Sequence, residues 1–181
     1  SPELTTSASA ECVKGCDLVV IATSSVFVRS SSRMVAPYLE KDAVVATVVK
    51  GVESGTMLRM SQIVEEETGH TVVALTGPSH AEEVGRCMPT GCLAACADLE
   101  KASFVQNAFC NDVFRIYTSD DIVGAELGGA LKNVIALCAG VTDGLGCGDN
   151  TKAMLMTRGL TEIARLGVAM GAHKETFAGL A

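Results

Sequence analysis

Lys132 is the residue of this sequence whose type and setting point most directly to chemistry. It lies in the stretch from Gly124 to Asn150, which predicts one almost uncharged helix followed by a glycine-rich turn. Because residues four apart share a helix face, Gly124, Gly128 and Lys132 line up and leave a groove open to the ammonium. Glycine inside a helix costs roughly 0.5–1 kcal/mol relative to alanine, so its use here suggests close approach by a ligand or a backbone. Two plainer interpretations stay open: a lysine that reaches out to water, and glycines that only permit tight helix packing.

Two further candidate positions follow predicted strands. Lys50 comes directly after a buried apolar run and is followed by Gly51, and Gly77-Pro78-Ser79 follows the next such run. Ligands of open parallel sheets bind beyond the carboxyl ends of the strands, where Lys50 would present a cation and the 77–79 turn a helix N-terminus suited to anions. A solvent-facing lysine and an ordinary tight turn are the alternatives.

The helices and strands that must position these residues are predicted from apolar runs and from the turn residues that bound them. Strands are predicted at 18–22, 43–49, 71–75, 91–97 and 114–118, because each is a short β-branched or small apolar run bounded by turn residues. Helices are predicted up to about residue 37, at 57–67 and at 99–109, with Ser79 as the N-cap of another and Glu82 completing a capping box. Alternating strands and helices predict an α/β fold with a mostly parallel sheet.

The pattern changes near residue 120. Beyond Ser119 long helical segments run from about Ile122 and from about Thr151 to Met170, with Gly171 as a helix end and another helix opening at His173. We therefore expect an α/β unit over residues 1–120 and the start of an all-helical unit over residues 121–181.

Composition excludes several classes of function. The chain of 181 residues has a net charge of −7, so it lacks the basic balance that nucleic-acid binding needs. No uninterrupted run of about 18 apolar residues occurs, and no membrane span is expected. The sequence starts at Ser1 without a Met or a signal-peptide pattern, and we expect it to be part of a longer one.

The eight cysteines do not form a metal-binding pattern. None are spaced as CxxC, and only three histidines could join them, so no metal site is expected. Most lie in apolar runs, where thiols behave as small hydrophobic groups, and we interpret them as structural residues of a protein in a reducing cytosol. A GxGxxG dinucleotide fingerprint is also absent from the sequence.

Together these segments resemble the NAD(P)-dependent glycerol-3-phosphate dehydrogenases of the bacterial type. The matching strings are VKGVE, GPSHAEEV, FRIYTS, ELGGALKNVI, DGLGCGDNTK and RGLTEIARLGVAMGA, at 49–53, 77–84, 114–119, 126–135, 143–152 and 158–172. The resemblance implies a Rossmann-like domain for the dinucleotide and a helical domain of the 6-phosphogluconate dehydrogenase C-terminal type. It implies interconversion of sn-glycerol 3-phosphate and dihydroxyacetone phosphate with NAD or NADP, supply of phospholipid synthesis, a cytoplasmic location and a homodimer.

The resemblance also assigns roles to individual residues. Lys132 matches the proton acceptor of the family, and Lys50 matches a lysine that touches both substrate and cofactor. The other matches are Gly77, Ser79 and Asn133 at the substrate, and Ala81 and Phe27 at the cofactor. The match at Phe27 is weak, because Thr23–Val26 departs from the proline-bearing version common in relatives.

These residue types suit oxidation of a secondary alcohol. A base must take the hydroxyl proton as hydride leaves the carbon, and a lysine serves only if burial or a second cation lowers its pKa from about 10.4. Lys50 would be that second cation and would stabilise negative charge on the oxygen.

Two departures and two rivals accompany this expectation. The glycine-rich phosphate loop expected before Ser1 and the Ser-Arg-Asn phosphate clamp expected after Ala181 are not in the sequence. A related 2-hydroxyacid or ketopantoate-type reductase would share the Rossmann domain, the helical domain and the Lys–Asn pair. A truncated, non-catalytic scaffold would need neither Lys50 nor Lys132.

Overall fold

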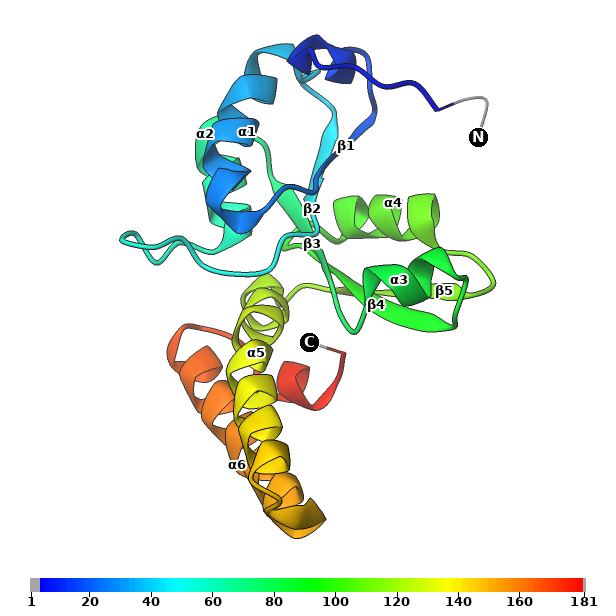
Figure 1. Cartoon of the computed structure of the whole chain (residues 1–181). Helices are drawn as coiled ribbons and strands as arrows, with labels where there is room; N and C mark the ends of the chain where they lie inside the picture. Colours follow the sequence, from blue (N-terminus) through cyan, green and yellow to red (C-terminus); the bar gives the residue numbers. More distant parts are fainter. Residues whose placement is uncertain (1–3, 181) are drawn as a thin grey trace.

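The computed structural model describes residues 4–180 and consists of a layered α/β part from which a helical hairpin projects (Figure 1). Residues 1–3 and 181, where the outer ends of the two expected units fall, lie outside the described residues. The strands are β1 (Leu18–Ile21), β2 (Val44–Thr47), β3 (Val72–Thr76), β4 (Thr90–Ala95) and β5 (Phe114–Ser119). The α-helices are α1 (Val28–Val35), α2 (Met60–Thr68), α3 (Ala81–Gly85), α4 (Leu99–Phe109), α5 (Ile122–Gly144) and α6 (Gly148–Ala169). Short 3-10 helices are η1 (Ala10–Val13), η2 (Ser25–Phe27), η3 (Ala36–Tyr38) and η4 (Lys174–Ala178).

The five strands form one sheet in the order β1-β2-β3-β4-β5. All neighbours pair in parallel except β3 and β4, which are antiparallel, so the sheet is mixed and the expectation of a mostly parallel α/β sheet is confirmed. As a consequence, the carboxyl ends of β1, β2 and β3 lie at the same edge as the start of β4. That edge receives Lys50 and Gly77.

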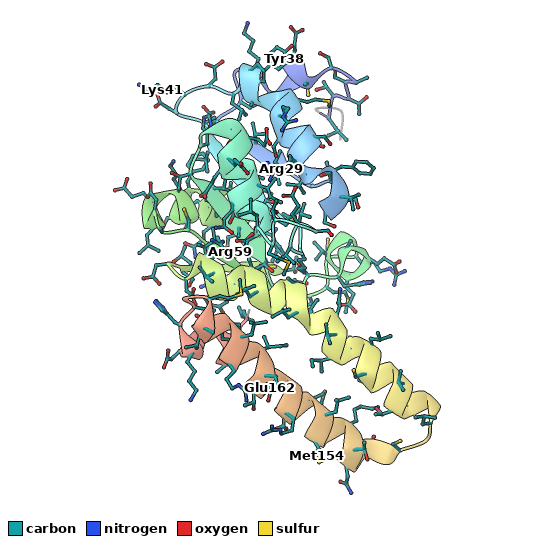
Figure 2. All side chains as sticks on the ribbon, turned by 90° about the vertical axis from the view of Figure 1, so that its left-hand side faces the viewer. Arg29, Tyr38, Lys41, Arg59, Met154 and Glu162 are labelled. Atoms are coloured by element: carbon teal, nitrogen blue, oxygen red, sulfur yellow. The ribbon has the colours of Figure 1, made fainter. Side chains whose placement is uncertain are left out.

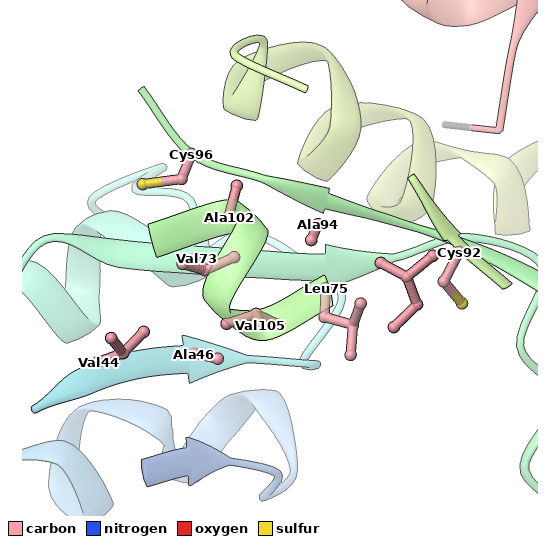
Figure 3. Close-up of a cluster of buried hydrophobic side chains, with 10 residues drawn as sticks. Val44, Ala46, Val73, Leu75, Cys92, Ala94, Cys96, Ala102 and Val105 are labelled. Carbon is pink, nitrogen blue, oxygen red and sulfur yellow. The ribbon is translucent and has the colours of Figure 1, made fainter. Parts of the chain in front are cut away.

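Side chains alternate between the two faces of the sheet, as the period of a strand requires. In β2, Val44 and Ala46 pack with Ala102 and Val105 of α4 on one face, whereas Val45 packs under α1 and α2 on the other. Figure 3 shows the cluster beneath α4, which is built of small side chains that let the helix lie close to the strands.

Asp121 anchors the helix that carries Lys132. Its carboxylate is buried and accepts hydrogen bonds from the Gly124 N–H (2.9 Å), the His173 N–H (2.9 Å) and the Thr176 hydroxyl (2.6 Å). The N-terminus of α5 and the segment around η4 are thereby joined through one side chain. Burial raises the pKa of this carboxyl, but the three hydrogen bonds outweigh it and hold the pKa below its ordinary value.

Helices α5 and α6 lie side by side as an antiparallel hairpin (Figure 1). Gly159 on α6 has no room for a side chain because Ile135 of α5 occupies that space, and Gly167 is filled in the same way by Phe177. Gly159 and Gly167 therefore serve the packing of α6 against its neighbours.

Two expectations about the helical part need correction. Helix α6 begins at Gly148 rather than near Thr151, and the segment after His173 forms the 3-10 helix η4 instead of an α-helix. Helix α5 is also long and apolar enough to cross a membrane by length and composition, with 33% of its most apolar window buried inside the chain. Glu126 and Lys132 interrupt this helix, so it is not an uninterrupted apolar run. Core helices of proteins without any span meet the same criterion, so the finding says no more than that.

Replacing Asp121 with asparagine should destabilise the fold by about 1–2 kcal/mol at neutral pH, because a helix cap loses its charge-assisted hydrogen bonds. A carboxyl whose folded pKa is lowered stabilises above its unfolded pKa and loses that contribution as pH falls through the folded value. The difference from wild type should therefore shrink as pH falls below about 4 in urea titrations. The neighbouring Asp120→Asn is the matched control, since Asp120 is exposed and its side chain caps nothing. Equal stability of the two variants at pH 7 would contradict the role of Asp121.

Candidate active site

Lys50 and Gly77 meet at the edge where β2 and β3 end. The half-buried Lys50 side chain donates a hydrogen bond from Nζ to the Gly77 carbonyl oxygen at 2.9 Å. Neighbouring parallel strands bring the residues that follow them together, so this contact follows from the register of β2 and β3.

Gly77 is required by its surroundings. Its φ of +147° is a conformation that side-chain-bearing residues rarely adopt, and a Cβ at this position would lie 3.0 Å from Cys92 Cα and from the Gly91 carbonyl oxygen. Because this turn packs closely against the start of β4, the position of the Gly77 carbonyl group that Lys50 contacts is fixed.

Helix α5 brings the second lysine to the same edge. Gly129 of α5 faces Lys50: a Cβ on Gly129 would lie 3.5 Å from Lys50 Cγ and 2.7 Å from Thr76 Oγ1. Lys132 follows one turn later and is exposed. The groove expected from Gly124 is wrong, because Asp121 and Thr176 fill the space beside that residue.

Two adjoining cavities contain most of the predicted site residues. One of about 460 Å³ is lined by Lys50, Ser79, Ala81, Lys132 and Asn133, together with Pro78, His80 and Glu83. The other, of about 260 Å³, is lined by Thr76, Gly77, Pro78, Gly129, Lys132, Gly179 and Leu180. Lys132 and Pro78 border both, so the two lysines, the asparagine and the 77–81 turn share one place on the surface.

Phe27 lies outside both cavities but at the same edge of the sheet. Its ring is 59% exposed, and its 3-10 helix η2 passes Gly51, whose missing Cβ would lie 3.6 Å from Ser25 Cβ. Ser79 does not cap a helix as expected: α3 begins at Ala81 after His80, and the Ser79 hydroxyl donates to the Gly77 carbonyl oxygen at 3.4 Å.

The charge of Lys132 affects the ionisation of Lys50. Burial lowers the pKa of the Lys50 ammonium below its ordinary value, and the positive charge of Lys132 lowers it further. Lys132 is exposed, as in the plainer interpretation of a lysine that reaches out to water, and Lys50 is the lysine that burial affects. A pair of ammonium groups beside a cavity attracts an anionic ligand and stabilises negative charge that develops on a bound oxygen.

The chain matches two family models that together cover most of its length. The description "NAD-dependent glycerol-3-phosphate dehydrogenase N-terminus" matches residues 3–102, and the corresponding C-terminus model matches residues 121–181. The chain belongs to the NAD-dependent glycerol-3-phosphate dehydrogenase family.

Individual relatives agree with this membership. The chain is 55% identical over 168 residues to glycerol-3-phosphate dehydrogenase [NAD(P)+] of Moorella thermoacetica, a match that covers 93% of this chain and 50% of that protein. A match of 51% identity over 171 residues to the same-named protein of a Thermoanaerobacter species covers 94% of this chain and 52% of that one. The chain thus spans about half the length of the curated relatives it matches.

Solved structures place the fold in the same family. The crystal structure of glycerol-3-phosphate dehydrogenase from Coxiella burnetii superposes with a TM-score of 0.86 at 32% identity, covering 92% of this chain and 51% of that one. A ketopantoate reductase from Ralstonia eutropha gives a TM-score of 0.56 at 19% identity, covering 92% of this chain and 56% of that one, which is a likeness of fold alone. That reductase therefore shares the fold, at a lower TM-score than the Coxiella burnetii enzyme.

Some family motifs lie away from the cavities. The turn at Leu145–Cys147 joins α5 to α6, and 13 residues of helix at 1.5 Å each put it about 20 Å from Lys132. In this chain the DGLGCGDN string is a helix connection, with Lys152 paired to Asp143 at 2.6 Å.

The cysteines divide into two groups. Cys92 and Cys96 are buried among the apolar side chains beneath α4, as expected of structural thiols. The structural interpretation is wrong for the four exposed ones, which are Cys12, Cys87, Cys138 and Cys147. They lie at chain turns or on the outer faces of helices, where nearby apolar letters in the sequence do not mean burial.

Sequence reasoning missed two features of this site. Thr76 is buried beside Gly129, and its hydroxyl has no hydrogen-bond partner among residues 4–180. Glu126 is buried on α5 and binds Arg59 and Ser61. The signal for Glu126 was available, since it is the only acidic residue in the first half of an apolar helix.

Adding a methyl group at Gly129 should destabilise the fold, because it pushes α5 away from its neighbours at this site. A Cβ in Gly129→Ala would lie 2.7 Å from Thr76 Oγ1, so Thr76 or the helix must move, and the variant should lose about 1–3 kcal/mol of unfolding free energy. Gly140→Ala on the same helix meets nothing within 4 Å and should stabilise by roughly 0.5–1 kcal/mol. Chemical denaturation measures both, and a Gly129 variant as stable as the Gly140 variant would show that α5 does not lie against Thr76 of β3.

Removing the charge of Lys132 should raise the pKa of Lys50, because a like charge no longer opposes its protonation. Competitive acylation of the Lys132→Met variant near pH 8, read by mass spectrometry, should therefore show slower modification of Lys50 than in wild type. The exposed Lys41 serves as the internal reference. Unchanged or faster modification of Lys50 would contradict the electrostatic coupling.

Proposed function

We propose that the protein containing this chain interconverts sn-glycerol 3-phosphate and dihydroxyacetone phosphate with NAD or NADP. The observation that carries the proposal is that Lys50 and Lys132 line one cavity with Ser79 and Asn133 in a member of this family. Residues 1–120 would contribute to the dinucleotide-binding domain and residues 121–181 to the helical substrate domain. A cytoplasmic homodimer that supplies phospholipid synthesis is part of the same proposal.

The described residues fit the nicotinamide end of such a cofactor. An exposed aromatic ring, Phe27, lies at the carboxyl edge of the sheet, and Ala81 lines the cavity that holds both lysines. The chemistry that a bound nicotinamide would supply is acceptance of the hydride that leaves the carbinol carbon of the substrate.

The lysines divide the remaining work. Lys132 Nζ, as the free amine, takes the hydroxyl proton as hydride leaves, and as the ammonium it returns that proton in the reductive direction. Lys50 stabilises the negative charge on the substrate oxygen from a position fixed by the Gly77 carbonyl. Gly77, Ser79 and Asn133 bind and orient the substrate next to the two amines.

A substrate comparison tests the reaction and both rivals. The intact protein should oxidise sn-glycerol 3-phosphate and leave pantoate unchanged, and its melting temperature should rise with NADH plus glycerol 3-phosphate. Turnover of pantoate alone would favour the related reductase. The absence of both turnover and thermal protection would favour the scaffold.

Lys132→Ala in the intact protein should lower kcat by at least about 10²–10⁴-fold, the range that general acid–base groups contribute, while the Kd for NADH stays near that of wild type. Steady-state kinetics and a fluorescence titration measure the two quantities. Lys152→Ala, which removes another lysine of the hairpin, is the control and should retain activity. Comparable turnover by the Lys132 variant would remove it from the mechanism.

A further inference from the structure

The segment that follows Lys50 forms a closed loop that ends at Arg59. Val52 and Arg59 pair as an antiparallel bridge, and the Glu53 N–H donates to the Leu58 carbonyl oxygen at 2.9 Å. Arg59 then starts α2, with the Gln62 side chain accepting from its N–H at 3.0 Å. Because the two ends of the loop are bonded to each other, a displacement of Arg59 is passed on to the backbone near Lys50.

Glu126 joins this loop to the helix that carries Lys132. Its carboxylate, 6% exposed, accepts from the Ser61 N–H at 2.8 Å and the Ser61 hydroxyl at 2.6 Å, and it forms an ion pair with Arg59. Arg59 Nη1 also donates to the Ser61 hydroxyl oxygen at 2.9 Å. Figure 2 shows Arg59 where α2 meets the first turns of α5.

These three residues make a contact that tolerates little displacement. A buried carboxylate without its partners is strongly disfavoured. Helix α5 is therefore held in the position in which Arg59 and Ser61 form hydrogen bonds with both carboxylate oxygens of Glu126. Bidentate acceptance by one carboxylate also fixes direction as well as distance. Arg59 belongs to the α/β part and Glu126, 67 residues later, to α5. The contact between them therefore sets how α5 lies against the α/β part.

The contact lies close to the two lysines. Gly129 is three residues after Glu126, and a Cβ there would lie 3.5 Å from Lys50 Cγ. Lys132 is six residues after Glu126, or about 9 Å along the helix axis at 1.5 Å per residue. A shift or rotation of α5 at Glu126 therefore changes the separation of Lys132 from Lys50 directly.

We propose that Glu126, held by Arg59 and Ser61, is a positioning residue that sets the separation of Lys50 and Lys132. This inference rests on the proposed function and goes beyond it, because none of these three residues touches the cavities. Misplacing a reacting group by about 1 Å can cost on the order of 10²-fold in rate. A residue that only stabilised the fold would change the melting temperature and leave kcat of the folded protein unchanged.

The test uses three variants of the intact protein. Glu126→Gln removes the charge that pairs with Arg59, and Ser61→Ala removes one hydrogen bond while leaving Glu126 and Arg59 in place. Gln106→Leu is the control: it removes a 2.7 Å hydrogen bond from α4 to the Ile116 carbonyl oxygen, away from the loop. For each, kcat and KM for glycerol 3-phosphate, the Kd for NADH and the melting temperature are measured. Crosslinking of Lys50 to Lys132 with disuccinimidyl glutarate is read by mass spectrometry.

The expected result separates positioning from stability. At temperatures where both variants are folded, Glu126→Gln and Ser61→Ala should lower kcat at least ten-fold and keep the Kd for NADH within two-fold of wild type. Both should also lower the yield of the Lys50–Lys132 crosslink. Gln106→Leu should lower the melting temperature and leave kcat and the crosslink unchanged. If either variant at Glu126 or Ser61 folds with wild-type kcat and crosslink yield, the inference is overturned.

Failure of the proposed function gives a different result. In that case wild type does not oxidise glycerol 3-phosphate, and the crosslink alone decides the inference. A lower yield in Glu126→Gln and Ser61→Ala than in wild type and Gln106→Leu would support it, and equal yields would reject it.

Discussion

The close approach of Gly129 of α5 to Thr76 and to the side chain of Lys50 is the constraint on which the candidate site depends. With no side chain at this position, α5 lies close enough to β3 for Thr76 and Lys50 to face its backbone. Lys132, one turn further along, then borders the cavity that Lys50 lines. A bulkier residue would move the helix outward and part the two amines.

Bringing two cations together has an electrostatic cost that the surrounding structure offsets. The Gly77 carbonyl accepts from Lys50, and the exposure of Lys132 leaves that ammonium hydrated. Burial of Lys50 lowers its pKa, and the repulsion that remains between the two ammonium groups lowers that pKa further. Repulsion of this kind is relieved when an anion binds, which gives the site a preference for a phosphate-bearing or oxyanionic ligand over a neutral one.

The sequence predicted the elements well because short apolar runs and strand-end turns depend on local chemistry. The contact between Lys50 and Gly77 was foreseeable, since both follow neighbouring strands. The antiparallel β4 was not, because direction depends on how the chain returns through α3. The roles of the individual site residues rest on the family resemblance, and the structure adds that most of them share one surface.

The features that escaped prediction depend on packing between distant segments. Helix periodicity aligns Gly124 with Lys132 but does not say which face meets the sheet, and the face that does so carries Gly129. Glu126 finds its partners 65 and 67 residues away, a distance at which no local pattern reports a contact. Burial of such a charge becomes understandable only when Arg59 and Ser61 are seen beside it.

The most direct measurement of the central claim, that Lys50 and Lys132 act on one substrate as a unit, is a double-mutant cycle in the intact protein. The kcat/KM for glycerol 3-phosphate would be compared among wild type, Lys50→Ala, Lys132→Ala and the double variant. Groups that act together give non-additive losses, so the double variant should be about as impaired as the worse single variant. Losses that multiply, as for independent sites, would contradict the account.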